Sequence, residues 1–204
     1  MRRIDIHQVA RGRSFLSMIS KAEAKDLLLA WLGLSLAFAI VQGGMVLTNP
    51  PTLVLTLVVS LSTVGLGFLL HELMHKFAAM RYGRYARFYA DRKMIIGALL
   101  MSLFGFVFAA PGAVVIHGHL TKKESAIVSA AGPATNILLS LLFWPLIAAG
   151  GFLGLIAAYG FRINAFLAVF NMIPVWQLDG AKILPYSKVM FGVLIGMPAI
   201  MLFI

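Results

Sequence analysis

The sequence predicts an all-α polytopic membrane protein, on three observations: its composition, the length of its apolar runs and the placement of its charges. Of the 204 residues, 61% are hydrophobic and 12% are charged, and the mean hydropathy of +0.94 lies outside the range of soluble domains. Several apolar runs reach about twenty residues, enough to cross roughly 30 Å of hydrocarbon. We therefore expect about five transmembrane helices in a single membrane domain over residues 1–204.

The first two membrane helices are expected at about 27–47 and at about 52–80, separated by the turn TNPP. Residues 1–26 are rich in Lys and Arg and predict a basic preface on the cytoplasmic surface. The apolar run that follows them is too long for a signal peptide and lacks an A-x-A-like cleavage site. We therefore expect it to be retained as a helix.

The segment near 94–120 is predicted to dip into the membrane without spanning it and to contain short β-strands. It follows the basic block RYGRYARFYADRK, and three glycines and a proline interrupt its apolar run. AGPATN then opens a helix that is expected to reach about residue 158. A polar YGFR separates this helix from the segment 163–180, and a last apolar run covers about 189–204.

The formal net charge of +10 comes from Lys and Arg blocks that lie between the apolar runs, so we interpret it as a marker of topology and expect no nucleic-acid partner. In the predicted layout all Lys and Arg residues except Arg162 and Lys76 lie on the cytoplasmic side of a cell membrane, with the N-terminus on that side. Cysteine is absent. A transition metal would therefore need nitrogen and oxygen ligands.

The pentapeptide HELMH at 71–75 predicts two metal ligands. On a helix, His71 and His75 point in nearly the same direction and can share one ion, while Glu72 lies beside that ion, free to act on zinc-activated water. A charged side chain in a transmembrane helix costs about 2.5 to 3.5 kcal/mol on insertion scales, so a Glu at this place indicates a function.

A catalytic zinc usually has three protein ligands and one open position, so a third ligand is expected elsewhere. Five of the seven acidic residues lie in the N-terminal preface or in polar loops, which leaves Glu72 and Asp179. Asp179 follows Pro174, which removes a backbone donor and predicts a helix broken beside the carboxylate. Alone, Asp179 could equally cap a helix end; together with HELMH, it is predicted to be the third ligand.

His117 and His119 form a second histidine pair, in VVIHGHL. Their spacing would point both imidazoles the same way on a strand, but we interpret them as a surface pair in a loop. A secondary role near the mouth of the site stays open.

HELMH at 71–75, AGPATN at 131–136 and NMIPVWQLDG at 171–180 together resemble the site-2 protease family of intramembrane zinc metalloproteases. The resemblance covers about residues 60–185. By this resemblance His71, His75 and Asp179 would bind Zn²⁺ and Glu72 would be the catalytic residue.

The resemblance also implies roles for two further elements. Asn171 and Pro174 match an N-x-x-P element implicated in holding substrate near the metal, and relatives often carry another Pro where this chain has VWQ. Gly132, Pro133 and Asn136 match a G-P-x-x-N element, for which packing and positioning are expected.

Ligation by both motifs constrains the topology, because the two motifs must lie at one depth. His71 and Asp179 are both late in their apolar segments, about 28 and 24 Å along each helix. They can meet only if the two segments run in the same direction, with a single crossing between them, at about 133–158. This layout places the site in the cytoplasmic half of the bilayer.

These residues predict an intramembrane zinc metalloendopeptidase that cleaves peptide bonds within or near transmembrane segments of membrane proteins. A helical substrate must unwind before its carbonyls become accessible. We expect GAVVIHG, with Val114 and Val115, to offer it a strand edge. The alternatives are a non-proteolytic metal-binding protein, such as a transporter or an inactive relative, and a membrane protease acting on soluble or prenylated peptides. A general base next to the ligands argues against transport.

Overall fold

The computed structural model describes residues 18–43, 49–107 and 111–204 and confirms the polytopic all-α class. Within these residues four helical segments are long and apolar enough to cross a membrane. The first is α2 (Lys21–Gly43), and the second is a continuous helix formed by α3 (Pro50–Ser60), the π-helical turn η3 (Leu61–Gly65) and α4 (Leu66–Arg81). The third is α6 (Lys122–Phe143) with the 3-10 turn η4 (Trp144–Ala149), and the fourth is α7 (Gly151–Asn171).

The last apolar run forms α9 (Lys188–Met201), which has 14 residues. At 1.5 Å per residue this helix is about 21 Å long, short of the roughly 30 Å of a hydrocarbon core. The described residues therefore contain four spanning candidates and one shorter apolar helix, where the sequence suggested about five spans.

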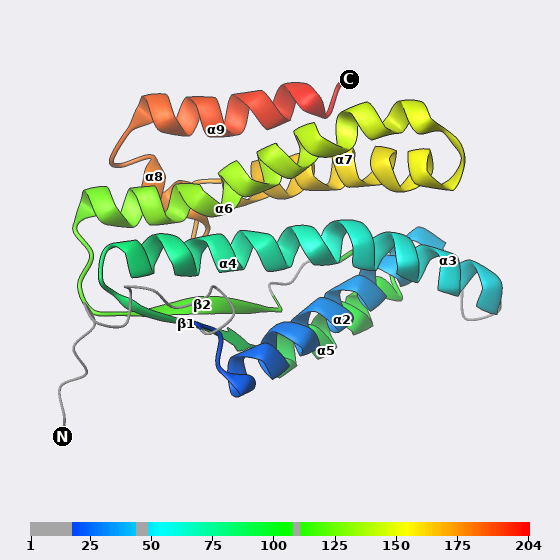
Figure 1. Ribbon diagram of the computed structural model, residues 1–204, viewed down its shortest axis with the longest axis horizontal. Helices are drawn as coiled ribbons and strands as arrows, with labels where there is room; N and C mark the ends of the chain where they lie inside the picture. The colour runs from blue at the N-terminus through cyan, green and yellow to red at the C-terminus, as the bar shows by residue number, and fades with distance from the viewer. Residues whose placement is uncertain (1–17, 44–48, 108–110) are drawn as a thin grey trace.

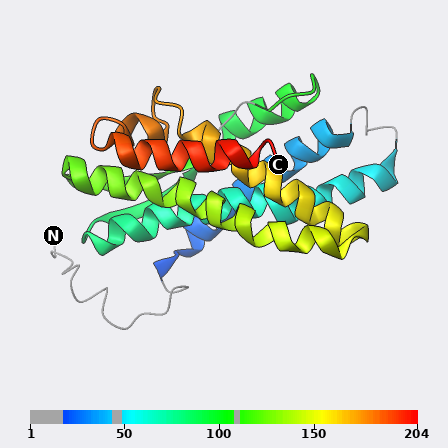
Figure 2. The same ribbon diagram turned by 90° about the horizontal axis from the view of Figure 1, so that it is seen from above.

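Helices α4, α6 and α7 run along the long axis of the molecule, and α9 lies over α6 and α7 (Figures 1 and 2). α4 and α7 point the same way, and α6 returns between them (Figure 1). For HELMH and Asp179 to meet, these two segments must run in the same direction, with a single membrane crossing between them, as the sequence predicted. The structure has this arrangement.

The break between the last two spans lies at Gly150, where η4 has ended and α7 begins, so its predicted position at YGFR is wrong. Gly150 and Gly151 have φ angles of 62° and 54°, which suit glycine and end the preceding helix. YGFR lies inside α7, and Arg162 is an exposed residue of that helix instead of a loop residue. A single charged residue was a weaker turn signal than two consecutive glycines.

A two-stranded antiparallel ribbon lies below α4 in Figure 1. It consists of β1 (Tyr85–Ala90) and β2 (Gly112–His117), with Phe88 opposite Val114. Helix α5 (Arg92–Ser102), capped by the Asp91 carboxylate, lies between the two strands in sequence and is too short to span. β2 falls within the segment where strands were expected. β1 does not, because it lies in the basic block interpreted as a loop.

The start of α2 belongs to the protein core, although the sequence assigned residues 21–26 to the basic preface. Glu23 is 2% exposed, and its carboxylate pairs with the Lys76 ammonium at 2.5 Å. The same carboxylate accepts a hydrogen bond from the Phe88 amide of β1 at 3.0 Å. One buried acid thus joins α2, α4 and the ribbon, through contacts 53 and 65 residues apart in the chain.

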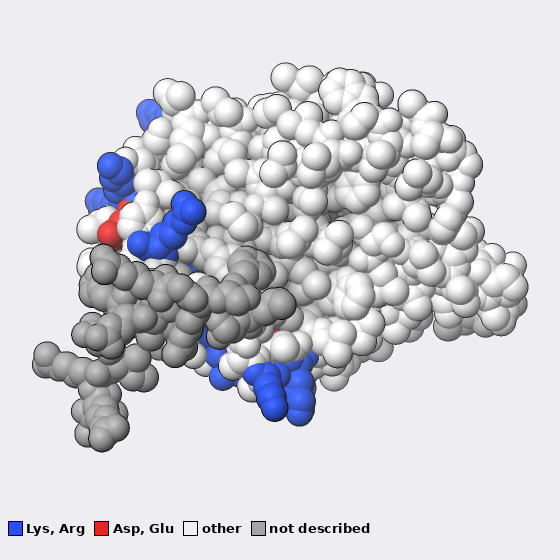
Figure 3. All heavy atoms as spheres, in the orientation of Figure 1, with Lys and Arg blue, Asp and Glu red and all other residues white. Residues whose placement is uncertain are grey.

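On the face shown in Figure 3, Lys and Arg side chains gather where α4 ends and α6 begins and near the start of α2, and the opposite end of this face carries none. This face therefore has a charged end and an apolar end along the direction of the long helices.

Candidate metal centre

His71 and His75 lie one turn apart on α4 and face α6. Both are buried, with 4% and 9% of their surface exposed. Their rings meet edge to face with centroids 4.6 Å apart, and the two Nε2 atoms are 3.0 Å apart. The four-residue spacing therefore does what the sequence predicted, because both imidazoles present the same nitrogen to one point.

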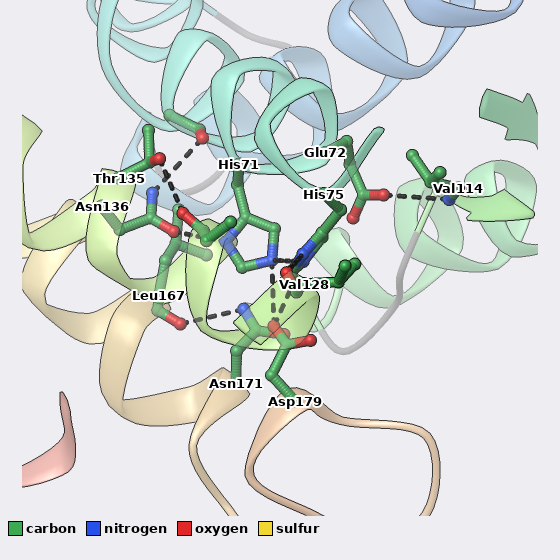
Figure 4. Close-up of polar contacts among 12 residues, drawn as sticks. His71, Glu72, His75, Val114, Val128, Thr135, Asn136, Leu167, Asn171 and Asp179 are labelled. Atoms are coloured by element: carbon green, nitrogen blue, oxygen red, sulfur yellow. Dashed lines mark hydrogen bonds and ion pairs between the residues drawn. The ribbon is translucent and has the colours of Figure 1, made fainter. Parts of the chain in front are cut away.

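Asp179 reaches that point from a distant part of the chain. α7 ends at Asn171, the chain turns through residues 172–178, and α8 (Asp179–Ile183) begins with the acid itself. One carboxylate oxygen lies 3.3 Å from the Nε2 atom of each histidine (Figure 4). Asp179 is 6% exposed, and a buried carboxylate of this kind needs a cation or a hydrogen-bonded partner.

The three ligand atoms fit a tetrahedral zinc ion. Bonds of 2.0 to 2.2 Å at tetrahedral angles place neighbouring ligand atoms about 3.3 Å apart, and the three separations here are 3.0, 3.3 and 3.3 Å. Two imidazoles and one carboxylate leave a fourth position open, as in catalytic zinc sites. Across residues 18–43, 49–107 and 111–204 this is the one such group of three potential ligands.

The other ring nitrogen of each histidine also has a partner, and these partners determine the tautomers. His71 Nδ1 lies 2.6 Å from Asn136 Oδ1, and His75 Nδ1 lies 2.8 Å from the main-chain carbonyl of Val128. Because both partners are acceptors, each Nδ1 carries the proton and each Nε2 presents its lone pair to the metal position. A main-chain partner such as Val128 leaves no signal in a sequence.

Gly132 gives the G-P-x-x-N element a definite structural role. A Cβ atom at this position would lie 2.5 Å from His75 Nε2 and 2.6 Å from His71 Nε2. The backbone of α6 thus approaches the ligand atoms more closely than any side chain permits, and Asn136, one turn further along, reaches His71. The element brings α6 against the histidines and orients one of them.

Glu72 lies beside the metal group without belonging to it. It is 9% exposed, and its Oε2 accepts a hydrogen bond of 3.1 Å from the Val114 amide of β2. Figure 4 shows the carboxylate turned toward Val114, away from Asp179. The two-stranded ribbon therefore lies directly next to the predicted catalytic residue.

The predicted substrate-binding residues surround this group in different ways. Val114 is half-buried next to Glu72, and Val115 is 44% exposed. Asn171 closes α7 beside Asp179 (Figure 4), with its amide donating to the Leu167 carbonyl at 2.9 Å. Pro174 is exposed in the loop that leads to Asp179. Val114 and Asn171 therefore lie beside the site, and none of the four residues forms an observed hydrogen bond with a ligand atom.

His117 and His119 lie apart from the metal group. Both are exposed, and the His117 ring lies 5.4 Å from the Tyr85 ring across the ribbon. This placement agrees with a surface pair, but the expected loop is wrong for His117, which is the last residue of β2 and pairs with Tyr85.

Comparisons with known proteins show to which family the chain belongs. No family model matches the chain, and no solved structure matches it significantly. Three curated proteins do match, and each is named a putative zinc metalloprotease. The chain is 37% identical over 172 residues to MJ0611 of Methanocaldococcus jannaschii, across 82% of this chain and 90% of that relative.

Two more distant relatives carry the same description. YwhC of Bacillus subtilis is 27% identical over 157 residues, across 66% of this chain and 68% of its own length. Rip2 of Mycolicibacterium smegmatis is 33% identical over 132 residues, across 54% of this chain and 50% of its own. The similarity to MJ0611 extends over most of the chain, and two helical histidines and a distant carboxylate are arranged as zinc ligands. The chain therefore belongs to the zinc metalloprotease family of these relatives.

Proposed function

We propose that this protein is an intramembrane protease of the site-2 type, which hydrolyses peptide bonds within or near the transmembrane segments of membrane proteins. One observation carries the proposal: the three potential zinc ligands converge on a helix that is itself long and apolar enough to span a membrane. His71 lies ten residues before the charged end of this helix at Arg81, or about 15 Å along its axis. The reaction would therefore take place below the membrane surface.

The proposed orientation puts the charged end of the molecule in the cytoplasm. Lys and Arg gather where α4 ends and α6 begins, and cytoplasmic loops carry an excess of these residues. The N-terminus and the site then lie on the cytoplasmic side of a cell membrane, with the site in the inner half of the bilayer.

In the proposed mechanism, His71, His75 and Asp179 hold Zn²⁺, which when bound supplies a Lewis acid that acidifies water and polarises a carbonyl. The Glu72 carboxylate accepts a proton from the attacking water and returns it to the leaving amine as the C–N bond breaks. The Val114 amide fixes this carboxylate by a hydrogen bond of 3.1 Å. The products are a carboxylate and an amine, and no covalent enzyme intermediate is formed.

The outer edge of β2, on the side away from β1, is the proposed docking place for the unwound substrate. In an antiparallel pair, facing residues alternate between those that bond to each other and those whose amides point outward. The Phe88 amide points out to Glu23 and the Val114 amide points out to Glu72, so Val114 and Ile116 direct their amides to the outer edge of β2. An extended peptide can add to that edge by backbone pairing, next to Glu72. Asn171 and Pro174 would border the substrate on the opposite side.

The principal test compares the wild-type protein with Glu72→Gln, purified in detergent. We expect both to hold one equivalent of zinc and only the wild type to cleave a single-span reporter. Glu124→Gln, a change of the same kind at the surface capping box of α6, should leave both properties intact. Equal cleavage by wild type and Glu72→Gln would remove Glu72 from the mechanism, and a wild type without zinc would remove the metal site.

A second test addresses the strand edge. Ile116→Pro removes an outward amide two residues from Val114 and leaves the bond to Glu72 in place, so cleavage should fall while bound zinc is unchanged. Ile116→Val retains the amide and is the matched control. Full cleavage of the reporter by Ile116→Pro would contradict docking at this edge.

A further inference from the structure

A chain of three hydrogen bonds connects His71 to the main chain of α7. Asn164 Nδ2 donates to the Gly160 carbonyl at 2.9 Å, and Asn136 Nδ2 donates to Asn164 Oδ1 at 2.9 Å. Asn136 Oδ1 in turn lies 2.6 Å from His71 Nδ1. Both asparagines have no exposed surface, so water cannot replace a partner in this chain.

The donor and acceptor of each of the three hydrogen bonds are fixed by the Gly160 carbonyl. A main-chain carbonyl can only accept, so Asn164 must turn its NH₂ group toward Gly160 and its oxygen toward Asn136. Asn136 must then donate to that oxygen, which leaves its own oxygen for His71. His71 has to donate from Nδ1, which leaves its Nε2, facing Asp179 and His75, as the ring nitrogen that can bind a metal.

We propose that Asn164 is a positioning residue of the metal site, which acts through Asn136 to hold His71 in the tautomer that binds zinc. Asn164 lies outside the three stretches on which the family resemblance rests, and the sequence offered no sign of its role. The proposal rests on zinc binding by His71, His75 and Asp179 and does not depend on the cleavage reaction.

A second acceptor for the Asn136 amide limits the loss of zinc affinity that removal of Asn164 can cause. Asn136 Nδ2 also donates to the Gly67 carbonyl of α4, at a longer distance of 3.3 Å. This bond favours the same amide orientation, so loss of Asn164 weakens the selection of the tautomer without abolishing it. Outer partners of metal ligands typically contribute 10- to 100-fold in metal affinity. We therefore expect a loss of about tenfold, at the lower end of that range.

The experiment measures the zinc dissociation constant by chelator competition in detergent. Asn164→Leu removes both hydrogen-bonding groups while keeping the number and branching of side-chain heavy atoms, and it should weaken zinc binding about tenfold. Ser140→Ala is the matched control, because the Ser140 hydroxyl donates to the Phe161 carbonyl at 2.7 Å across the same α6–α7 contact without reaching His71. It should leave zinc affinity unchanged.

Testing Asn164→Leu a second time, in a protein that also carries Asn136→Asp, distinguishes the positioning of His71 from a general effect on helix packing. In Asn136→Asp, either carboxylate oxygen can accept from His71, so no amide has to be oriented. Asn164→Leu should then cause no further loss of zinc affinity. Equal losses in both backgrounds, or none in the otherwise wild-type chain, would overturn the proposal. Absence of zinc from the wild type would instead count against the proposed function.

Gly67→Ala keeps the test decisive where Asn164→Leu does not fold, and the chemical shifts of His71 test the tautomer directly where it does. Gly67→Ala leaves every amide in place, but its Cβ would collide with Asn164 Oδ1, and it should also weaken zinc binding. The nitrogen-15 chemical shifts of His71 in zinc-free protein should show a proton on Nδ1 in the wild type and a mixture of tautomers in Asn164→Leu. Unchanged zinc affinity in Gly67→Ala, or the same tautomer in wild type and Asn164→Leu, would contradict the assignment.

Discussion

Replacing Gly132 by Ala should strongly weaken zinc binding while leaving the fold intact. The new methyl group would lie 2.5 to 2.6 Å from the ring atoms of His71 and His75, about 1 Å inside an ordinary van der Waals contact. Zinc sites tolerate displacements of only about 0.2 Å in ligand distance. Because Val128, on the same helix, holds His75 at 2.8 Å, α6 cannot move away without losing that bond. The loss of zinc affinity should reach about 100-fold, the upper end of the range for changes next to ligands.

The assay is metal content after dialysis together with thermal unfolding in detergent. Ala is favoured over Gly in a helix by about 1 kcal/mol, so α6 itself should not be weakened and the zinc-free form should unfold near the temperature of the zinc-free wild type. Gly192→Ala makes the same change on α9, where no atom lies within 4 Å of the new methyl group, and should keep its zinc. Stoichiometric, tightly bound zinc in Gly132→Ala would refute the close approach described above.

Three further outcomes follow from the structure. Glu23→Gln leaves Lys76 as an unpaired buried charge and should destabilise the protein by about 3 to 5 kcal/mol, whereas Asp26→Asn breaks only a part-exposed pair with Arg87 and should cost under about 1 kcal/mol; chemical denaturation of both variants checks this. Thr121→Ala removes the capping box of α6 and should cost about 1 kcal/mol in the same measurement. Removal of zinc by a chelator should lower the melting temperature of the wild type but not of His75→Ala, since only a protein that binds the ion is stabilised by it.

The amino-acid sequence by itself determined the class of the protein and the local part of its site. Membrane helices are recognisable because an apolar run must match the thickness of the hydrocarbon. The placement of His71 and His75 on the same face of a helix follows from the helical period alone. Asp179 could be selected because few acidic residues exist in the chain, and the direction of the two motif-bearing helices followed from the need for both motifs to meet at one depth.

Tertiary structure alone decided which distant groups complete these local features. The sequence assigned Glu23 to a basic preface, and only its contacts with Lys76 and Phe88 make it a core residue. The orientation of His71 depends on an amide from α6 and another from α7. Such partners are fixed by the packing of whole helices and by main-chain carbonyls, which have no spacing rule and no residue identity to reveal them in a sequence.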